Sequence, residues 1–189
     1  MRRISTITVA GVLIAFALSL PVAAQRSAHD FEGHKVSLQL PPGYVLQAEP
    51  SPRPGMKTIG FSTDPRSDGT RGMIQVTLVD LNQAPPGEKP TLERFATAMI
   101  DDVRKRRSRW EQTDSDTKVA GVHAKRIEWT GSNEPGFGRP PINMRGVMIV
   151  GIKKNLAFSL HTQDVVAFAD TTIPLCEQAL QTFAVTLKQ

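Results

Sequence analysis

One cysteine and four histidines are the residues of this chain that could support nucleophilic chemistry. If folding brought His123 or His161 beside Cys176, the imidazole could activate the thiol, as in thiol enzymes and small hydrolases. The neighbours that would share a helical face with the cysteine are apolar, which favours a small buried thiol instead. These neighbours are Ile173, Leu180 and Phe183. We therefore expect a buried cysteine, with a Cys–His enzyme as the alternative.

Other catalytic and metal-binding patterns are missing from the sequence. It contains no nucleophile elbow, phosphate-binding loop or zinc-protease helix. The histidines, which include His29 and His34 near the start of the folded part, lack the close spacing to other donors that metal sites use. We therefore expect a protein that is not an enzyme and that holds no metal or cofactor.

A run of cations at positions 104–109 is a candidate binding patch. It consists of Arg104, Lys105, Arg106, Arg107 and Arg109. Such a run could contact an anionic lipid surface, nucleic acid or an acidic partner. A helix through the run would spread these side chains around its axis, and Asp101 and Asp102 lie four residues before Lys105 and Arg106 as intrahelical partners. This favours a structural role, with a patch of Arg104, Arg106, Arg107 and Arg109 as the alternative.

The segment 132–143 is a second candidate partner surface. It carries Phe137 and Arg139 among prolines and glycines, a composition that favours an exposed aromatic ring beside a cation. Aromatic and arginine side chains are enriched at the energetic centres of interfaces. A binding module would therefore centre its partner surface on Phe137 and Arg139. The alternative is a plain surface connection between two strands.

Residues 1–24 have the pattern of a secretory signal peptide. Two arginines precede an uncharged apolar run at 7–20, and small residues follow up to Ala24. Signal peptidase would cut after Ala24 and leave residues 25–189 as one mature domain, periplasmic or secreted. The alternative is an uncleaved anchor, because the uncharged span could just cross a bilayer.

Composition limits the partners of this mature chain. Loss of the two leader arginines leaves 21 of the 23 basic residues against 18 acidic ones, which lowers the formal net charge from +5 to +3. A charge this small does not indicate specific nucleic-acid binding. No further apolar run is long enough to span a membrane. The expected partner is an unidentified protein or an anionic surface.

The first part of the mature chain is predicted to be extended. Val36, Leu38 and Leu40 alternate with polar residues, which is typical of a half-buried strand. The Pro-Pro-Gly at 41–43 then predicts a turn. Further strands are predicted at 44–46, 57–62, 72–81, 119–122 and 123–130.

Two helices are predicted. Apolar residues between Leu92 and Val103 recur at helical spacing, and Thr91 can serve as the N-cap. The second helix is predicted at about 171–183, with Asp170 as a possible N-cap.

The segment 146–152 decides the predicted fold class. It is apolar on both faces, and it should form an antiparallel hairpin with 156–160. A strand of this kind needs cover on both sides. The predicted fold is therefore α+β, an antiparallel β-sheet flanked by helices on both faces.

The order of these elements resembles the PsbP-like superfamily, whose α/β/α sandwich is shared by the Ran-binding nuclear import factors and by exported bacterial proteins. The resemblance rests on 36–44, which is similar to the opening strand and P-x-G-[WY] turn of that family. The helix from Leu92, the hairpin about 153–155 and the closing helix that ends at Phe183 fit as well. The resemblance covers nearly all of the mature chain. It implies a non-enzymatic scaffold used for binding, and it transfers no catalytic or metal site.

The signal peptide predicts where the mature chain begins. The exported protein should start at Gln25 or within a few residues of it, because signal peptidase selects the small residues before that point. Mass spectrometry of the intact exported protein measures this directly. Recovery of the full chain from Met1 in the membrane pellet would instead identify an uncleaved anchor.

Overall fold

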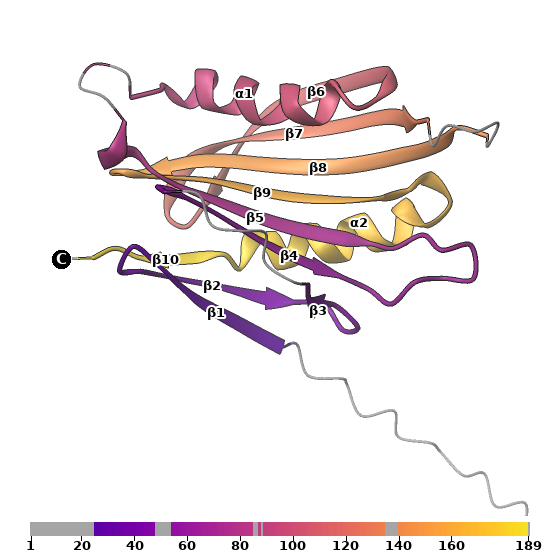
Figure 1. The fold of residues 1–189 in the computed structure, drawn as a ribbon, viewed down its shortest axis with the longest axis horizontal. Coiled ribbons are helices and arrows are strands. Elements are labelled where there is room, and N and C mark those ends of the chain that lie inside the picture. Colours follow the sequence, from indigo (N-terminus) through magenta and orange to yellow (C-terminus); the bar gives the residue numbers. More distant parts are fainter. Residues whose placement is uncertain (1–24, 48–53, 85–86, 88, 135–139, 189) are drawn as a thin grey trace, which may run out of the picture.

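The computed structural model describes residues 25–47, 54–84, 87, 89–134 and 140–188. Within them the chain is α+β, as predicted, with antiparallel strands in two sheets and two helices packed on them (Figure 1). The predicted signal peptide lies outside the described residues, and so do Phe137 and Arg139. No helix within the described ranges is long and apolar enough to cross a membrane.

The elements up to the first helix are β1 (Gln25–Phe31), β2 (His34–Leu40), β3 (Val45–Leu46), β4 (Met56–Ser62), β5 (Met73–Asp80), a 3-10 turn η1 (Leu81–Gln83) and α1 (Leu92–Arg104). The elements after it are β6 (Ser108–Val119), β7 (Val122–Asn133), β8 (Ile142–Lys153), β9 (Leu156–Val165), α2 (Val166–Gln181) and β10 (Ala184–Thr186). The larger sheet has the order β3-β4-β5-β9-β8-β7-β6, and the smaller one has the order β1-β2-β10.

The β8–β9 hairpin lies at the centre of the larger sheet. Its strands pair from Lys153 and Leu156 outward, as the sequence predicts. Val147 and Ile149 belong to the apolar cluster that contains α2 and the smaller sheet, whereas Met148 and Val150 belong to the cluster that contains α1. Because consecutive strand residues point to opposite faces, β8 is buried on both of its faces.

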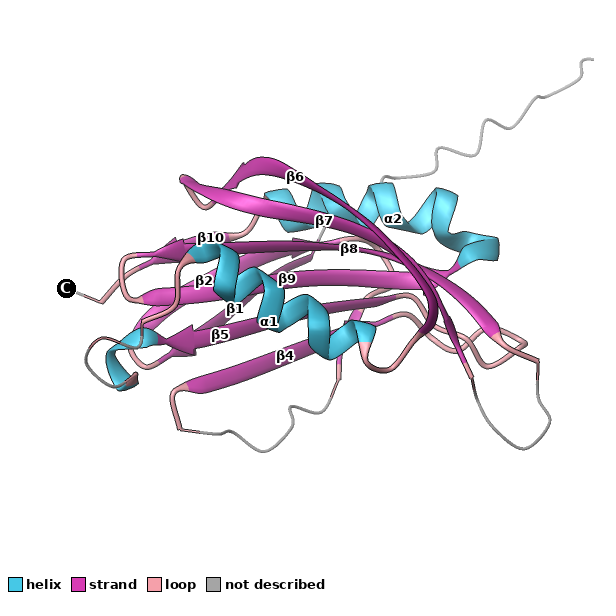
Figure 2. Cartoon of the chain, turned by 90° about the horizontal axis from the view of Figure 1, so that it is seen from above, coloured by secondary structure: helices cyan, strands magenta, loops and turns pink. Residues whose placement is uncertain are grey.

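Helix α1 begins as predicted, and it covers only part of its face of the sheet. The Thr91 hydroxyl accepts a hydrogen bond from the Arg94 N–H at 3.3 Å, and Phe95, Ile100 and Val103 are buried. The helix has 13 residues and β8 has 12. These counts correspond to about 20 Å of helix against roughly 40 Å of strand. The helix crosses the strands obliquely (Figure 2), so part of their face extends beyond its end.

The start of α2 differs from the prediction. The helix begins at Val166, and Asp170 is inside it, where its carboxylate pairs with Arg145 at 2.9 Å. The N-cap residue is Val165, which has no side-chain capping bond, so the sequence carried no capping signal there. Pro174 therefore lies in the helix interior, where it removes one backbone hydrogen-bond donor.

Strands β1 and β10 are further differences, because the sequence predicted neither. β1 contains Arg26, His29 and Asp30 without a clean alternation of apolar residues, and β10 has only three residues. Both strands form by pairing with β2. Tertiary pairing, and not local pattern, creates these two elements.

Phe95 is buried on the sheet side of α1, which predicts a large effect of its truncation. Phe95→Ala should lower the free energy of unfolding by about 3 kcal/mol, because it removes a core aromatic ring and leaves a cavity. Denaturant melts measure the difference. Thr97→Ala, on the exposed side of the same helix, is the control and should change stability by no more than about 0.5 kcal/mol. A loss below about 1 kcal/mol for Phe95→Ala would contradict the packing described.

Candidate functional site

The basic run spans the junction between α1 and β6. Arg104 is the last residue of α1, and residues 105–107 form a turn closed by the Arg107 N–H donating to the Arg104 carbonyl at 2.9 Å. Ser108 already pairs with Ser132 of β7. The prediction of a helix through the whole run is therefore wrong beyond Arg104, because strand pairing takes over.

Two cations of the run have acidic partners on α1. Arg106 pairs with Asp102 at 3.1 Å, as the spacing predicted. Asp101 lies 3.8 Å from Arg104 and is not paired with Lys105. All these side chains are substantially exposed, so the pairs stabilise the fold only weakly. Arg109 is exposed at a bulge of β6, where its φ is 51°.

Arg107 is the one member of the run that points inward. Its Nη2 donates to Gln163 Oε1 at 3.2 Å, and its Nη1 donates to the Arg106 carbonyl at 3.1 Å. Its Nε is buried and has no hydrogen-bond acceptor, and no described carboxylate forms an ion pair with this guanidinium. Burial lowers the pKa of Arg107, and the neighbouring Arg106 adds to that shift. Arg107 is thus a half-buried cation without a counter-charge in the described part of the chain.

Trp129 positions the groups around Arg107. Its indole ring stacks on Trp110 with centroids 5.0 Å apart, and the Arg107 guanidinium carbon lies 5.7 Å from the Trp129 ring centroid. Gly146 is the residue opposite Trp129 on β8. A Cβ at Gly146 would lie 2.6 Å from this ring and 2.6 Å from a backbone oxygen, so glycine is required for the ring to cross β8.

His161 on β9 lies beside the indole N–H of Trp129. The Trp129 Nε1–H donates to His161 Nε2 at 3.2 Å. The histidine is only 5% exposed, and burial, aided by the positive charge of Arg107, lowers its pKa to about 3. The imidazole is therefore neutral at physiological pH. Because Nε2 is an acceptor, the ring proton must be on Nδ1.

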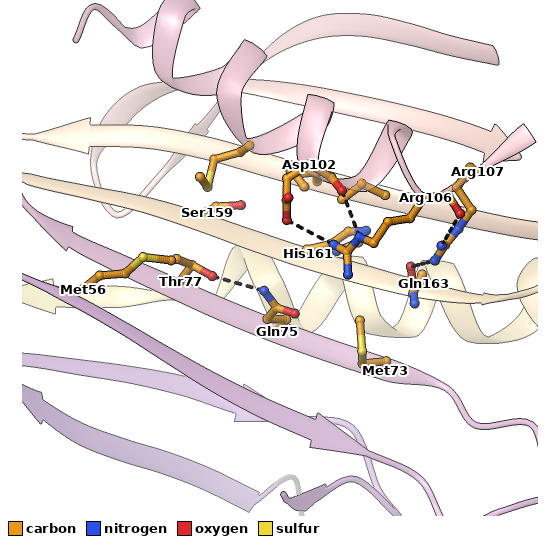
Figure 3. A pocket seen from close by; sticks show the side chains of 13 residues that line it. Met56, Met73, Gln75, Thr77, Asp102, Arg106, Arg107, Ser159, His161 and Gln163 are labelled. Carbon is orange, nitrogen blue, oxygen red and sulfur yellow. Dashed lines mark hydrogen bonds and ion pairs between the residues drawn. The ribbon is translucent and has the colours of Figure 1, made fainter. Parts of the chain in front are cut away.

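These groups line a pocket of about 190 Å³ beside the end of α1 (Figure 3). Polar side chains of β5 and β9 face it, and they are Gln75, Thr77, Ser159, His161 and Gln163. Apolar walls come from Met56, Met73, Met99 and Met148. Asp102, Arg106 and Arg107 lie at its α1 side. A pocket with a cation, neutral hydrogen-bonding groups and flexible apolar walls can bind a small polar group.

The structure does not bring Cys176 together with a histidine. The thiol is 1% exposed and donates to the Tyr44 hydroxyl at 3.0 Å, and burial raises its pKa. His161 pairs with Met148 and so belongs to the α1 face of the sheet, whereas Cys176 packs on the other face. His123 is exposed and lies 3.2 Å from Asp116 on the β6–β7 ribbon. The predicted burial of Cys176 is confirmed.

A buried ion pair lies near the Tyr44 hydroxyl and acts on it electrostatically. Asp164 is fully buried, and Arg66 donates to both of its carboxylate oxygens at 2.8 and 2.6 Å. The Pro-Pro-Gly-Tyr turn thus holds its tyrosine inside the structure. In the described ranges, His, Cys, Asp and Glu side chains form no group of three that could hold a metal ion.

Sequence reasoning missed the pocket, although β9 carried a signal for it. Along this strand, apolar Phe158 and Leu160 alternate with polar Ser159, His161 and Gln163. All but Gln163 are buried. A polar face on a strand that is buried on both sides indicates either a hydrogen-bond network or a pocket.

No family model matches this chain, and no curated protein matches its sequence. Solved structures do match its fold. PsbP of Synechocystis sp. PCC 6803 has a TM-score of 0.57 and 15% identity, over 95% of this chain and 98% of that protein. LpqN of Mycobacterium tuberculosis, involved in cell envelope biogenesis, has a TM-score of 0.56 and 13% identity, over 86% of this chain and 91% of that protein. The Ran-binding protein Mog1p of Saccharomyces cerevisiae has a TM-score of 0.54 and 10% identity, over 85% of this chain and 95% of that protein.

These similarities show that the chain has the PsbP-like fold. The resemblance seen in the sequence is confirmed at that level. At such low identities a shared fold does not transfer a site, so the function must be argued from the residues around Arg107 and His161.

Buried His161 predicts a pH dependence of stability. In the unfolded chain a histidine titrates near its ordinary pKa of about 6.5, whereas the pKa of folded His161 is about 3. Between these values only the unfolded state binds the proton. Lowering the pH below 6.5 should therefore destabilise the fold by roughly 1.4 kcal/mol per pH unit through this group.

Denaturant melts of the native protein and of His161→Gln between pH 7 and pH 4 measure this contribution. The variant should lose that part of the slope, and His123→Gln, which changes an exposed ring, should retain it. Equal slopes for the native protein and His161→Gln would mean that His161 binds its proton in the folded state.

Proposed function

We propose that this chain is an exported, soluble, non-enzymatic binding module that contacts an anionic partner through the end of α1. The observation that carries the proposal is the half-buried Arg107 guanidinium, which forms no ion pair with a described carboxylate. A cation held out of water without a counter-charge costs free energy. An anionic group from a partner would remove that cost, so the arrangement favours binding of an anion.

The cations next to Arg107 in the chain add to the positive potential. Lys105 and Arg109 are exposed, and among the described residues the ion pairs of this run are Asp101 with Arg104 and Asp102 with Arg106. Clustered charge of one sign speeds encounter with an oppositely charged partner. The surface defined by residues 104–109 is therefore the part of the molecule that we expect an anionic partner to meet first.

Phe137 and Arg139 lie outside the described residues, but the described strand before their segment pairs with part of the basic run. The strands that flank their segment end at Asn133 and resume at Ile142. Ser132 pairs with Ser108, which lies within the basic run 104–109. We therefore propose that the segment carrying Phe137 and Arg139 contributes an aromatic ring and a cation to the same partner contact.

The proposed domain is residues 25–189 after removal of the signal peptide 1–24. We infer an α/β/α sandwich for it, because α1 and α2 pack with alternate residues of β8. The leader pattern supports export to the periplasm or beyond the cell. LpqN, which has this fold, is described as involved in cell envelope biogenesis, and Mog1p is described as a Ran-binding protein. Both descriptions are in keeping with an exported or partner-binding role.

The Cys–His enzyme is the weaker proposal. Its thiol is buried, donates to Tyr44 and has a raised pKa, whereas a nucleophilic cysteine needs an accessible thiolate. Of the two histidines that could activate it, His123 is exposed near the start of β7, and His161 lies on the opposite face of the sheet. The geometry therefore supports binding over thiol chemistry.

Capture from the exported fraction tests the binding module. The immobilised mature chain should retain a partner that salt elutes, because the contact is electrostatic. A triple variant, Arg104→Gln with Lys105→Gln and Arg109→Gln, should reduce capture at least tenfold. A matched variant with the same loss of charge, Arg26→Gln with Lys35→Gln and Lys188→Gln, alters exposed cations of the smaller sheet and the carboxyl-terminal end.

The matched variant should capture the partner as well as the native chain does. Equal losses in the two triple variants would mean that net charge alone retains the partner. If neither triple variant weakens capture, the end of α1 is not the surface that binds the partner.

A further inference from the structure

We propose that the pocket beside α1 binds a carboxylate group carried on a short aliphatic stem, with Arg107 and His161 as its hydrogen-bond donors. The inference rests on the proposed function for its location, and it names the chemical group that enters. Three observations support this inference. They are two donors without an acceptor, the charge of the pocket, and the apolar residues of its walls.

The first unused donor belongs to Arg107. Its Nε and Nη2 share one edge of the guanidinium, a fork that matches the two oxygens of a carboxylate. Nη2 donates to the Gln163 side chain, but the adjacent Nε is buried without an acceptor. Figure 3 shows the Gln163 side chain beside the Arg107 guanidinium and the hydrogen bond that joins them. A carboxylate that displaces the Gln163 carboxamide would satisfy both donors of the fork.

The second unused donor belongs to His161. Because His161 Nε2 accepts from Trp129, the neutral ring carries its proton on Nδ1. His161 lines the pocket, and no side chain or carbonyl of the described residues accepts from Nδ1. This donor comes from β9, whereas Arg107 comes from the turn after α1. Donors from two separate elements therefore lie at one pocket, and neither Arg107 Nε nor His161 Nδ1 has a bonded acceptor among the described residues.

The charge of the pocket favours a monoanion. Asp102 and Arg106 neutralise each other at its rim, and Arg107 is the remaining charge. His161 stays neutral, because burial and the nearby arginines oppose its protonation. A phosphate dianion would bring two negative charges to one cation, with the Asp102 carboxylate close by. A carboxylate matches the single positive charge.

The walls of the pocket favour an aliphatic stem. Met73, Met99 and Met148 line it, and methionine adapts its shape to apolar groups at little cost. The volume of about 190 Å³ suits a small molecule or one side chain. A free short-chain acid and a glutamate side chain of a protein partner share this chemistry, so the experiment compares the two sources.

Pentanoate is the first probe, and the tryptophans report its binding. The chain has two tryptophans, and both lie beside the pocket, where Trp129 bonds to His161 and Trp110 stacks on Trp129. A titration of the mature protein should change the tryptophan fluorescence saturably, with a Kd of about 1 mM, as expected for a ligand of seven heavy atoms. Pentanamide, which has the same shape without the charge, should bind at least tenfold more weakly.

Two variants of Arg107 and one control test the assignment. Arg107→Met removes the charge and should weaken pentanoate binding at least tenfold. Arg107→Lys keeps the charge but lacks the fork, so it should weaken binding several-fold. Arg94→Met removes an exposed arginine of α1 that does not line the pocket, and it should leave the Kd unchanged. Thermal melts establish that each variant is folded, and Arg107→Lys keeps the test valid if Arg107→Met does not fold.

The second probe is a short blocked peptide with one glutamate, compared with its glutamine counterpart. Binding of pentanoate alone identifies a small free acid as the ligand, and binding of both probes identifies a carboxylate side chain. Either result supports the proposal. It is overturned if neither probe saturates by 50 mM, if pentanamide binds as well as pentanoate, or if folded Arg107 variants bind unchanged. Those results would not decide whether the surface 104–109 captures a partner, because the triple variants test that proposal separately.

Discussion

Strands β8 and β9 need cover on both faces, and on one face that cover comes from a helix about half as long as the strands. Helix α1 packs mainly on β8 and β7, and the face of the sheet continues over β9 and β5, where polar side chains and methionines line the pocket. The turn after Arg104 directs Arg107 toward this uncovered region. The partial cover by α1 thus leaves room for the pocket, and a half-buried cation lies beside it.

Trp129 connects side chains of neighbouring strands beside the pocket. Its ring crosses β8 at Gly146, stacks on Trp110 and donates to His161, so that three strands contribute to one wall. The donation to His161 also fixes the histidine tautomer, because a neutral imidazole that accepts at Nε2 must donate at Nδ1. A structural interaction in the core therefore sets the hydrogen-bonding character of the pocket. The PsbP-like fold provides the framework, but these side chains define the chemistry.

The sequence predicts the parts of this arrangement that depend on local patterns. Helical spacing after Thr91 predicts α1, and the two apolar faces of 146–152 predict a doubly covered strand. The end of α1 could not be predicted, because the basic run itself suits a helix and only pairing of Ser108 with Ser132 ends it. The meeting of Arg107 with His161 depends on sheet register and on the space that Gly146 leaves, neither of which a local pattern encodes.

The most direct test of the account is the NMR signal of the Arg107 Nε–H during a titration with pentanoate. A carboxylate that accepts from this donor should shift its proton resonance downfield and saturably, together with the side-chain amide of Gln163. The Nε–H of exposed Arg94 should not move. Equal shifts at all exposed arginines, with no saturable change at Arg107, would contradict the assignment of a carboxylate site to the end of α1.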